Sequence, residues 1–170
     1  MEFDDVIKKR ASCKSYDGKA IPRDVIEKII DAARQAPSGH NRQAWKFVVV
    51  EDVKKLKGIF EQDFPYDAGA IIICCSNAAE YTGDEFTDAD TKAVRDLSIA
   101  SAFITLKATE LGIGNCYVAW ADREKLKQVL GIPKEYIVPY VITLGYEKEH
   151  RERDPKKKLK EIMSYNNFGK

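Results

Sequence analysis

Two cations and a hydroxyl lie close together near the start of the chain, at Arg10, Ser12 and Lys14. They follow a stretch from about Phe3 to Lys9 whose apolar residues have helical spacing. Charge-assisted donors on neighbouring short segments suit a phosphate monoester. Cations at the C-terminal end of a helix also interact favourably with its dipole, which is a purely structural explanation. The residues alone leave both interpretations open.

A second polar group, the loop formed by Pro37, Ser38, Gly39 and Asn41, consists of turn-forming residues. It leads into Trp45–Val50, whose aromatic and β-branched residues predict a buried strand. A donor-rich loop at the start of a core strand is suited to ligand binding. The plainer interpretation is an ordinary connection between a helix and a strand.

The elements that must position these residues alternate between helical and strand patterns, which predicts one sheet of about four strands with helices on both sides. Apolar spacing predicts helices at about 3–9, 25–33, 53–60, 91–111 and 123–130. Strands are predicted at 45–50, 68–75, 115–120 and 140–146. Cys74 and Cys75 should then point to opposite faces of their strand.

Length and composition bound the class of protein. A chain of 170 residues is long enough for one domain with a proper core, so we expect a single domain over 1–170 with a basic tail from about 147. A net charge of +1 gives no argument for nucleic acid or for a membrane surface. The acidic start lacks the signal-peptide pattern, and the longest apolar run, Ala68–Cys75, is too short to span a membrane. We therefore expect a cytoplasmic protein that binds neither nucleic acid nor membranes.

Several familiar chemistries lack their motifs. The four cysteines include no CxxC pair, and with only two histidines they offer no zinc spacing, so no metal is expected. Gly112-Ile113-Gly114 lacks the third glycine of a dinucleotide fingerprint and leads from a helix into a strand, the reverse of the required order. Phosphate-binding, zinc-hydrolase and serine-hydrolase signatures are also absent from the sequence.

Five motifs nevertheless occur in a defined order along the chain. They are Arg10-x-Ser12-x-Lys14-x-Tyr16, Pro37-Ser38-x-x-Asn41-x-Gln43-x-Trp45, Asp96-x-x-x-Ala100, Leu111-Gly112-Ile113-Gly114-x-Cys116-Tyr117, and Leu144-Gly145-Tyr146 before a basic tail. Together they resemble the nitroreductase family of FMN-dependent enzymes. The resemblance implies an α+β fold with a mixed central sheet flanked by helices, and an intertwined homodimer with FMN at the subunit interface.

The resemblance also assigns cofactor-binding residues from one subunit. Arg10, Ser12 and Lys14 would contact the FMN phosphate, the ribityl chain and the N1/O2 edge of the ring. A tail cation would complete the phosphate site, and the register before Leu159 favours Lys156 over Arg153. The ring would face main chain from one further segment, with an N–H near N5: Tyr117, Val118, Ala119 and Trp120.

The other subunit would contribute the central loop to the same flavin, through Pro37, Ser38, Gly39 and Asn41. No dedicated catalytic side chain is expected, because the cofactor carries the hard chemistry. The implied function is an oxidoreductase that takes hydride from NADH or NADPH onto flavin N5 and reduces a small-molecule acceptor by a ping-pong route. Nitroaromatics, quinones and related compounds are the expected acceptors.

Three alternatives remain open at this point. A different flavin reaction such as reductive dehalogenation would need a well-formed lid, and the shortness of the candidate lid segment, 77–90, argues against it. A non-catalytic FMN-binding dimer would contain the same motifs. A basic-tailed interaction module would depend on the tail alone.

The chain departs from the family pattern at Ala11. His40 and Arg42 add charge to the central loop. Phe168 in the tail is a candidate anchor on a partner subunit.

Overall fold

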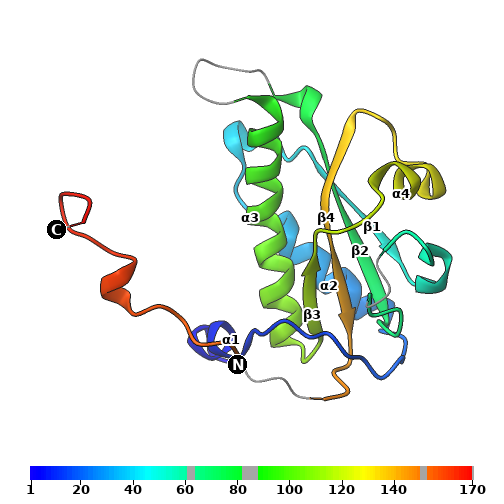
Figure 1. The fold of residues 1–170 in the computed structure, drawn as a ribbon, viewed down its shortest axis with the longest axis horizontal. Helices are drawn as coiled ribbons and strands as arrows, with labels where there is room; N and C mark the ends of the chain where they lie inside the picture. The colour runs from blue at the N-terminus through cyan, green and yellow to red at the C-terminus, as the bar shows by residue number, and fades with distance from the viewer. Residues whose placement is uncertain (61–63, 82–87, 150–152, 170) are drawn as a thin grey trace.

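The computed structural model describes residues 1–60, 64–81, 88–149 and 153–169 (Figure 1). Its sheet has the order β1-β2-β4-β3. The strands are β1 (Trp45–Val50), β2 (Ala70–Asn77), β3 (Gly114–Val118) and β4 (Tyr136–Gly145). The helices are α1 (Phe3–Lys9), α2 (Arg23–Arg34), α3 (Ala89–Glu110) and α4 (Arg123–Leu130).

All three pairings between these strands are antiparallel. The sheet was predicted to be mixed, but the described strands form an antiparallel sheet, and a parallel bridge between Ser12 and Asn115 lies outside the strand pairings. Because β2 and β3 are both antiparallel to β4, they run parallel to each other with β4 between them, and α3 connects them across the sheet. The α+β class is confirmed.

Two hydrophobic clusters cover the two faces of the sheet. Ile72, Cys74 and Ile142 pack with residues of α2 and α3 on one face. The adjacent residue Cys75 faces a second cluster that includes Leu126 of α4. Successive side chains of a strand point to opposite faces, so the predicted separation of the two cysteines is confirmed.

Two predicted elements differ from the structure. The helix expected at 53–60 is a single 3-10 turn, Val53–Leu56, because the chain turns away at Gly58, where φ is +81°. Its apolar residues are still buried. The apolar spacing therefore predicted correctly which side chains are buried, but not the length of the helix. Strand β1, predicted to be a buried strand, lies at an edge of the sheet, and only Val50 is fully buried.

The long helix α3 carries buried polar residues in both halves. Asp96 lies in its first half, and Thr105 and Thr109 lie in its second. The helix begins at an N-cap on Asp88 and ends before Gly112, which has a φ of +75°. With 22 residues at 1.5 Å each, α3 is about 33 Å long. The two groups of polar residues therefore serve different ends of the molecule.

The C-terminal tail is unlike the rest of the chain. Residues 153–169 are exposed, contain one 3-10 turn at Leu159–Glu161, and run away from the domain (Figure 1). Part of the predicted tail and of the predicted lid, 150–152 and 82–87, lies outside the described residues. No helix in the described ranges is long and apolar enough to cross a membrane.

Candidate functional site

The strip that contains Arg10, Ser12 and Lys14 is fixed to the sheet by backbone and side-chain bonds. The Cys13 N–H donates to the Asn115 carbonyl at 3.0 Å, beside the bridge from Ser12. The buried hydroxyl of Tyr16 donates to the Cys13 carbonyl at 2.9 Å and lies 2.7 Å from the Thr143 hydroxyl of β4. Burial raises the pKa of Tyr16, so this hydroxyl stays protonated and remains a donor.

Lys14 lies at a hollow of about 240 Å³ beside the end of β3. The other lining residues come from β3, from the segment after it and from the turn before β2: Phe64, Pro65, Cys116, Tyr117, Val118, Ala119 and Trp120. The structure therefore brings Lys14 together with the whole predicted ring-facing segment. Trp120 is 75% exposed at the rim, and Phe64 is buried.

Arg10 lies near this hollow as well. Burial raises the pKa of the Tyr117 hydroxyl, and the positive charge of Arg10 acts in the opposite direction. Arg10 and Ser12 are both half-buried, whereas Lys14 is exposed. Of these three side chains, the exposed one, Lys14, is therefore the one that lines the hollow.

The loop of Pro37, Ser38, Gly39 and Asn41 is elsewhere. Its Gly39 N–H donates to Asp96 Oδ2 at 2.7 Å, in the first half of α3. Its Ser38 hydroxyl accepts from the Gln43 N–H at 3.0 Å, which closes the loop on itself.

Helix α3 separates the two halves of the predicted site. The Asn115 side chain, beside Ser12, donates to the Thr105 carbonyl and to the Thr109 hydroxyl. These residues are 9 and 13 positions from Asp96, which corresponds to about 14–20 Å along the helix. The structure does not bring the Pro37–Asn41 loop and Lys14 together within one chain.

The two candidate phosphate cations of the tail have different surroundings. Arg153 donates through Nη1 to the Ile7 carbonyl at 2.9 Å and to the Lys8 carbonyl at 3.3 Å, so it caps the C-terminal end of α1. Lys156 is exposed, and no described residue pairs with it. Of the two, Lys156 is the cation available to a ligand.

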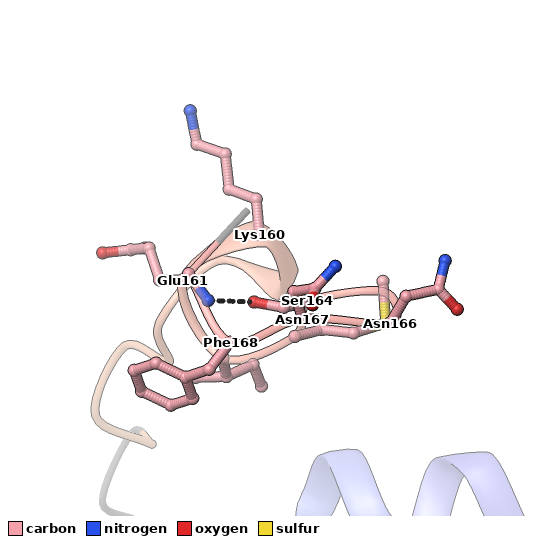
Figure 2. A pocket seen from close by; sticks show the side chains of 9 residues that line it. Lys160, Glu161, Ser164, Asn166, Asn167 and Phe168 are labelled. Atoms are coloured by element: carbon pink, nitrogen blue, oxygen red, sulfur yellow. Dashed lines mark hydrogen bonds between the residues drawn. The ribbon is translucent and has the colours of Figure 1, made fainter.

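A further hollow, about 790 Å³, is lined within the described residues by the tail alone, from Lys160 to Gly169. Figure 2 shows its side chains around a loop that the Gly169 N–H closes on the Ser164 hydroxyl, with Phe168 pointing outward. We do not assign it as a ligand site, because its walls are one short exposed segment.

Sequence reasoning missed three residues of these surroundings. Phe64 and Pro65 line the hollow although they are far in sequence from its other lining residues. No local sequence pattern indicates that they belong to this site. Tyr81 donates to Asp96 at 3.0 Å and carries the Arg42 guanidinium over its ring at 5.6 Å. Asp96 itself was part of a recognised motif, but without a role.

Comparison with known proteins identifies the family. The model described as "Nitroreductase family" matches residues 7–62 and 59–146. The chain belongs to the nitroreductase family. A relative from Archaeoglobus fulgidus, named "Putative NADH dehydrogenase/NAD(P)H nitroreductase", is 35% identical over 153 residues and covers 84% of each chain. The recognition made from the five motifs is thus confirmed.

Solved structures of other nitroreductase family members share the fold. A nitroreductase family protein from Clostridium difficile has a TM-score of 0.86 at 28% identity, over 98% of this chain and 99% of that one. A second C. difficile structure, titled an FMN-dependent nitroreductase, has a TM-score of 0.81 at 26% identity, over 96% and 98%. The described fold is therefore that of the family over nearly its whole length.

Proposed function

We propose that this nitroreductase family member is a homodimeric oxidoreductase that uses FMN to pass hydride from NADH or NADPH to nitroaromatic, quinone or related acceptors. Membership of the family supports the enzyme class, and the names of similar proteins give the cofactors. The acceptors and the ping-pong order through flavin N5 rest on the chemistry of the cofactor. The four buried cysteines are all free, which favours a reducing, cytoplasmic location.

The observation that carries this proposal is Lys14 at the hollow beside the end of β3. The hollow combines apolar and aromatic walls with one ammonium, which fits a flat ring that has a polar edge. FMN supplies hydride transfer when bound. The chain would contribute the positive charge of Lys14 near N1, where it stabilises negative charge, and main-chain donors from Tyr117–Trp120 near N5. Arg10 and Ser12 would extend the contacts toward the phosphate.

The size of the hollow indicates that one chain does not complete the site. Its 240 Å³ is below the roughly 300–1,000 Å³ of typical ligand pockets. The Pro37–Asn41 loop lies at the other half of α3 and cannot close this hollow in the same chain. In a two-fold dimer, the loop of a second copy can supply the missing wall.

The tail supports the same assembly. Its apolar side chains are exposed to an extent that is unusual for a soluble chain on its own. They are Leu159 (65%), Ile162 (66%), Met163 (42%), Tyr165 (74%) and Phe168 (104%). A second copy of the chain, with Phe168 as the anchor, is the occupant we propose for this surface.

The test is a visible spectrum of the purified protein, supplied with FMN and then with NADH or NADPH without oxygen. We expect flavin absorption bands at about 370 and 450 nm that bleach on addition of the nucleotide. Bands that stay unbleached would support the non-catalytic FMN-binding dimer. A colourless protein that takes up no FMN and oxidises no NAD(P)H would contradict the proposal.

A further inference from the structure

The backbone of the central loop has an unusual conformation. His40, Asn41 and Gln43 have φ values of 53°, 56° and 53°. This left-handed region is uncommon for residues other than glycine, and three such residues within four positions are costly together. A conformation of this kind persists only where surrounding contacts determine it. The contacts around the loop should therefore show what maintains it.

The main external contact is a buried carboxylate. Asp96, on α3, accepts the Gly39 N–H at 2.7 Å, and its side chain is 2% exposed. A Cβ added at Gly39 would lie 3.1 Å from Arg95 Nη2 and 3.4 Å from Asp96 Oδ2, so the loop backbone packs closely against these two side chains of α3. The loop is thus fitted to this carboxylate.

Two further groups hold the carboxylate of Asp96 in place and keep it ionised. The Tyr81 hydroxyl donates to the same oxygen at 3.0 Å, and Arg95 Nε donates to the other oxygen at 3.0 Å. Burial alone would raise the pKa of Asp96, but the donors from Gly39, Arg95 and Tyr81 together lower it. Burial and the neighbouring Asp96 raise the pKa of Tyr81 to about 12, so Tyr81 remains a donor near neutral pH.

We propose that Asp96, oriented by Tyr81, is a positioning residue that sets the backbone of the Ser38–Gln43 loop before any ligand is bound. This inference rests on the proposed function, in which the loop reaches the FMN of a second subunit. A preformed loop avoids the entropy cost of ordering at the moment of binding. Asp96 touches no ligand in this account, and its effect on binding passes through the Gly39 N–H.

Variants can separate this role from general stability. Asp96→Asn keeps one oxygen for Gly39 and Tyr81 and loses only Arg95, whose side chain is 53% exposed. Asp96→Leu removes both acceptors and leaves the Gly39 N–H and the Tyr81 hydroxyl unpaired. Tyr81→Phe removes one donor to the carboxylate. Tyr140→Phe is a matched control, because its hydroxyl also bonds to α3, at Ser98 and Ser101, without contacting the loop.

The first readout, amide hydrogen exchange in the FMN-free protein, needs no ligand. We expect the Gly39 amide to be protected in the wild type, to exchange about tenfold faster in Asp96→Leu, and to change little in Asp96→Asn or Tyr140→Phe. Tyr81→Phe should give an intermediate rate. An unprotected Gly39 amide in the wild type, or equal rates in all folded variants, would overturn the inference even if the protein binds FMN. If Asp96→Leu does not fold, the exchange rate of the Gly39 amide in Tyr81→Phe, compared with the rate in Tyr140→Phe, tests the inference.

The second readout is FMN affinity, from quenching of flavin fluorescence. We expect a loss of about tenfold in Asp96→Leu, a smaller loss in Tyr81→Phe, and less than about threefold in Asp96→Asn. Altered exchange with unchanged affinity would overturn the link to binding. A wild type that binds no FMN would contradict the proposed function, while the exchange data would still test the positioning role by itself.

Discussion

The two halves of the proposed site are fixed by different kinds of interaction. The strip around Lys14 is joined to β3 and β4 by backbone bonds and by the neutral hydroxyl of Tyr16. Within the part of the chain that the structure describes, the Pro37–Asn41 loop pairs with no strand, and its main external contact is the ionised carboxylate of Asp96. The first arrangement is determined by the sheet and the second by a few side chains. The loop half should therefore respond more strongly to pH, and the sheet-bound half should respond more strongly to a substitution that crowds its packing.

The largest effect is expected from Gly145→Ala, which acts on the sheet-bound half. A Cβ there would lie 2.6 Å from Tyr16 Cδ1 and 3.1 Å from the Gly69 nitrogen. Because neither the ring nor the backbone has room to move, we expect a loss of about 3 kcal/mol in the free energy of unfolding, measured with denaturant. Gly18→Ala is the control, since nothing lies within 4 Å of it and only its φ of +77° is unfavourable, at about 1 kcal/mol. Equal losses would show that Tyr16 is not tightly packed against the sheet.

Lys14→Ala should leave stability unchanged and affect chemistry. Removal of the ammonium from the hollow is expected to lower kcat/KM for NAD(P)H oxidation about 30-fold, the value of one charge-assisted bond. Lys19→Ala is the control, because Lys19 is also exposed but pairs with Asp17 on the surface, away from the residues that line the hollow. Similar rates for the two variants would remove Lys14 from the site.

Acid should weaken the loop half before the sheet half. The lowered pKa of Asp96 means that its contribution to stability is complete above the ordinary carboxyl pKa of about 3.9 and is lost as pH falls through the lower, folded value. Wild type should thus exceed Asp96→Asn in stability at pH 7, and the difference should shrink below about pH 4. A difference that is constant with pH would contradict an ionised Asp96. Denaturant unfolding at a series of pH values measures it.

The smallest effects are expected in the tail. Arg153→Ala removes two bonds to carbonyls of α1 and should cost about 0.5–1 kcal/mol of stability without altering ligand preference.

Lys156→Ala should leave stability unchanged and weaken the binding of FMN about threefold, while riboflavin, which lacks the phosphate, binds as before. The reverse pattern would make Arg153 the phosphate ligand.

The sequence predicted best what depends on local pattern. The bounds of α1, β1 and α4 and the opposite faces of Cys74 and Cys75 agree with the structure. Each is set by neighbours within a few residues or by strand alternation. The helix expected at 53–60 was wrong, because apolar spacing cannot reveal that Gly58 turns the chain.

The site was predictable only in part for the same reason. Motif order identified Lys14 and Tyr117–Trp120, which the structure brings together. The walls formed by Phe64 and Pro65, and the link from Tyr81 to Asp96, join residues that only the tertiary fold makes neighbours. The distance between the two halves likewise follows from α3. Apolar spacing in the sequence predicts the length of this helix, but it does not predict which residues pack against each end.

The most direct test of a site shared between two chains is complementation between two impaired variants. Lys14→Ala impairs one half, and Asn41→Gly impairs the other while it tolerates the φ of 56°. If the halves meet across a two-fold interface, mixed dimers contain one intact and one doubly altered site, so unfolding and refolding an equal mixture should restore roughly a quarter of wild-type NAD(P)H oxidation. A mixture no more active than the average of the two variants would contradict the shared site.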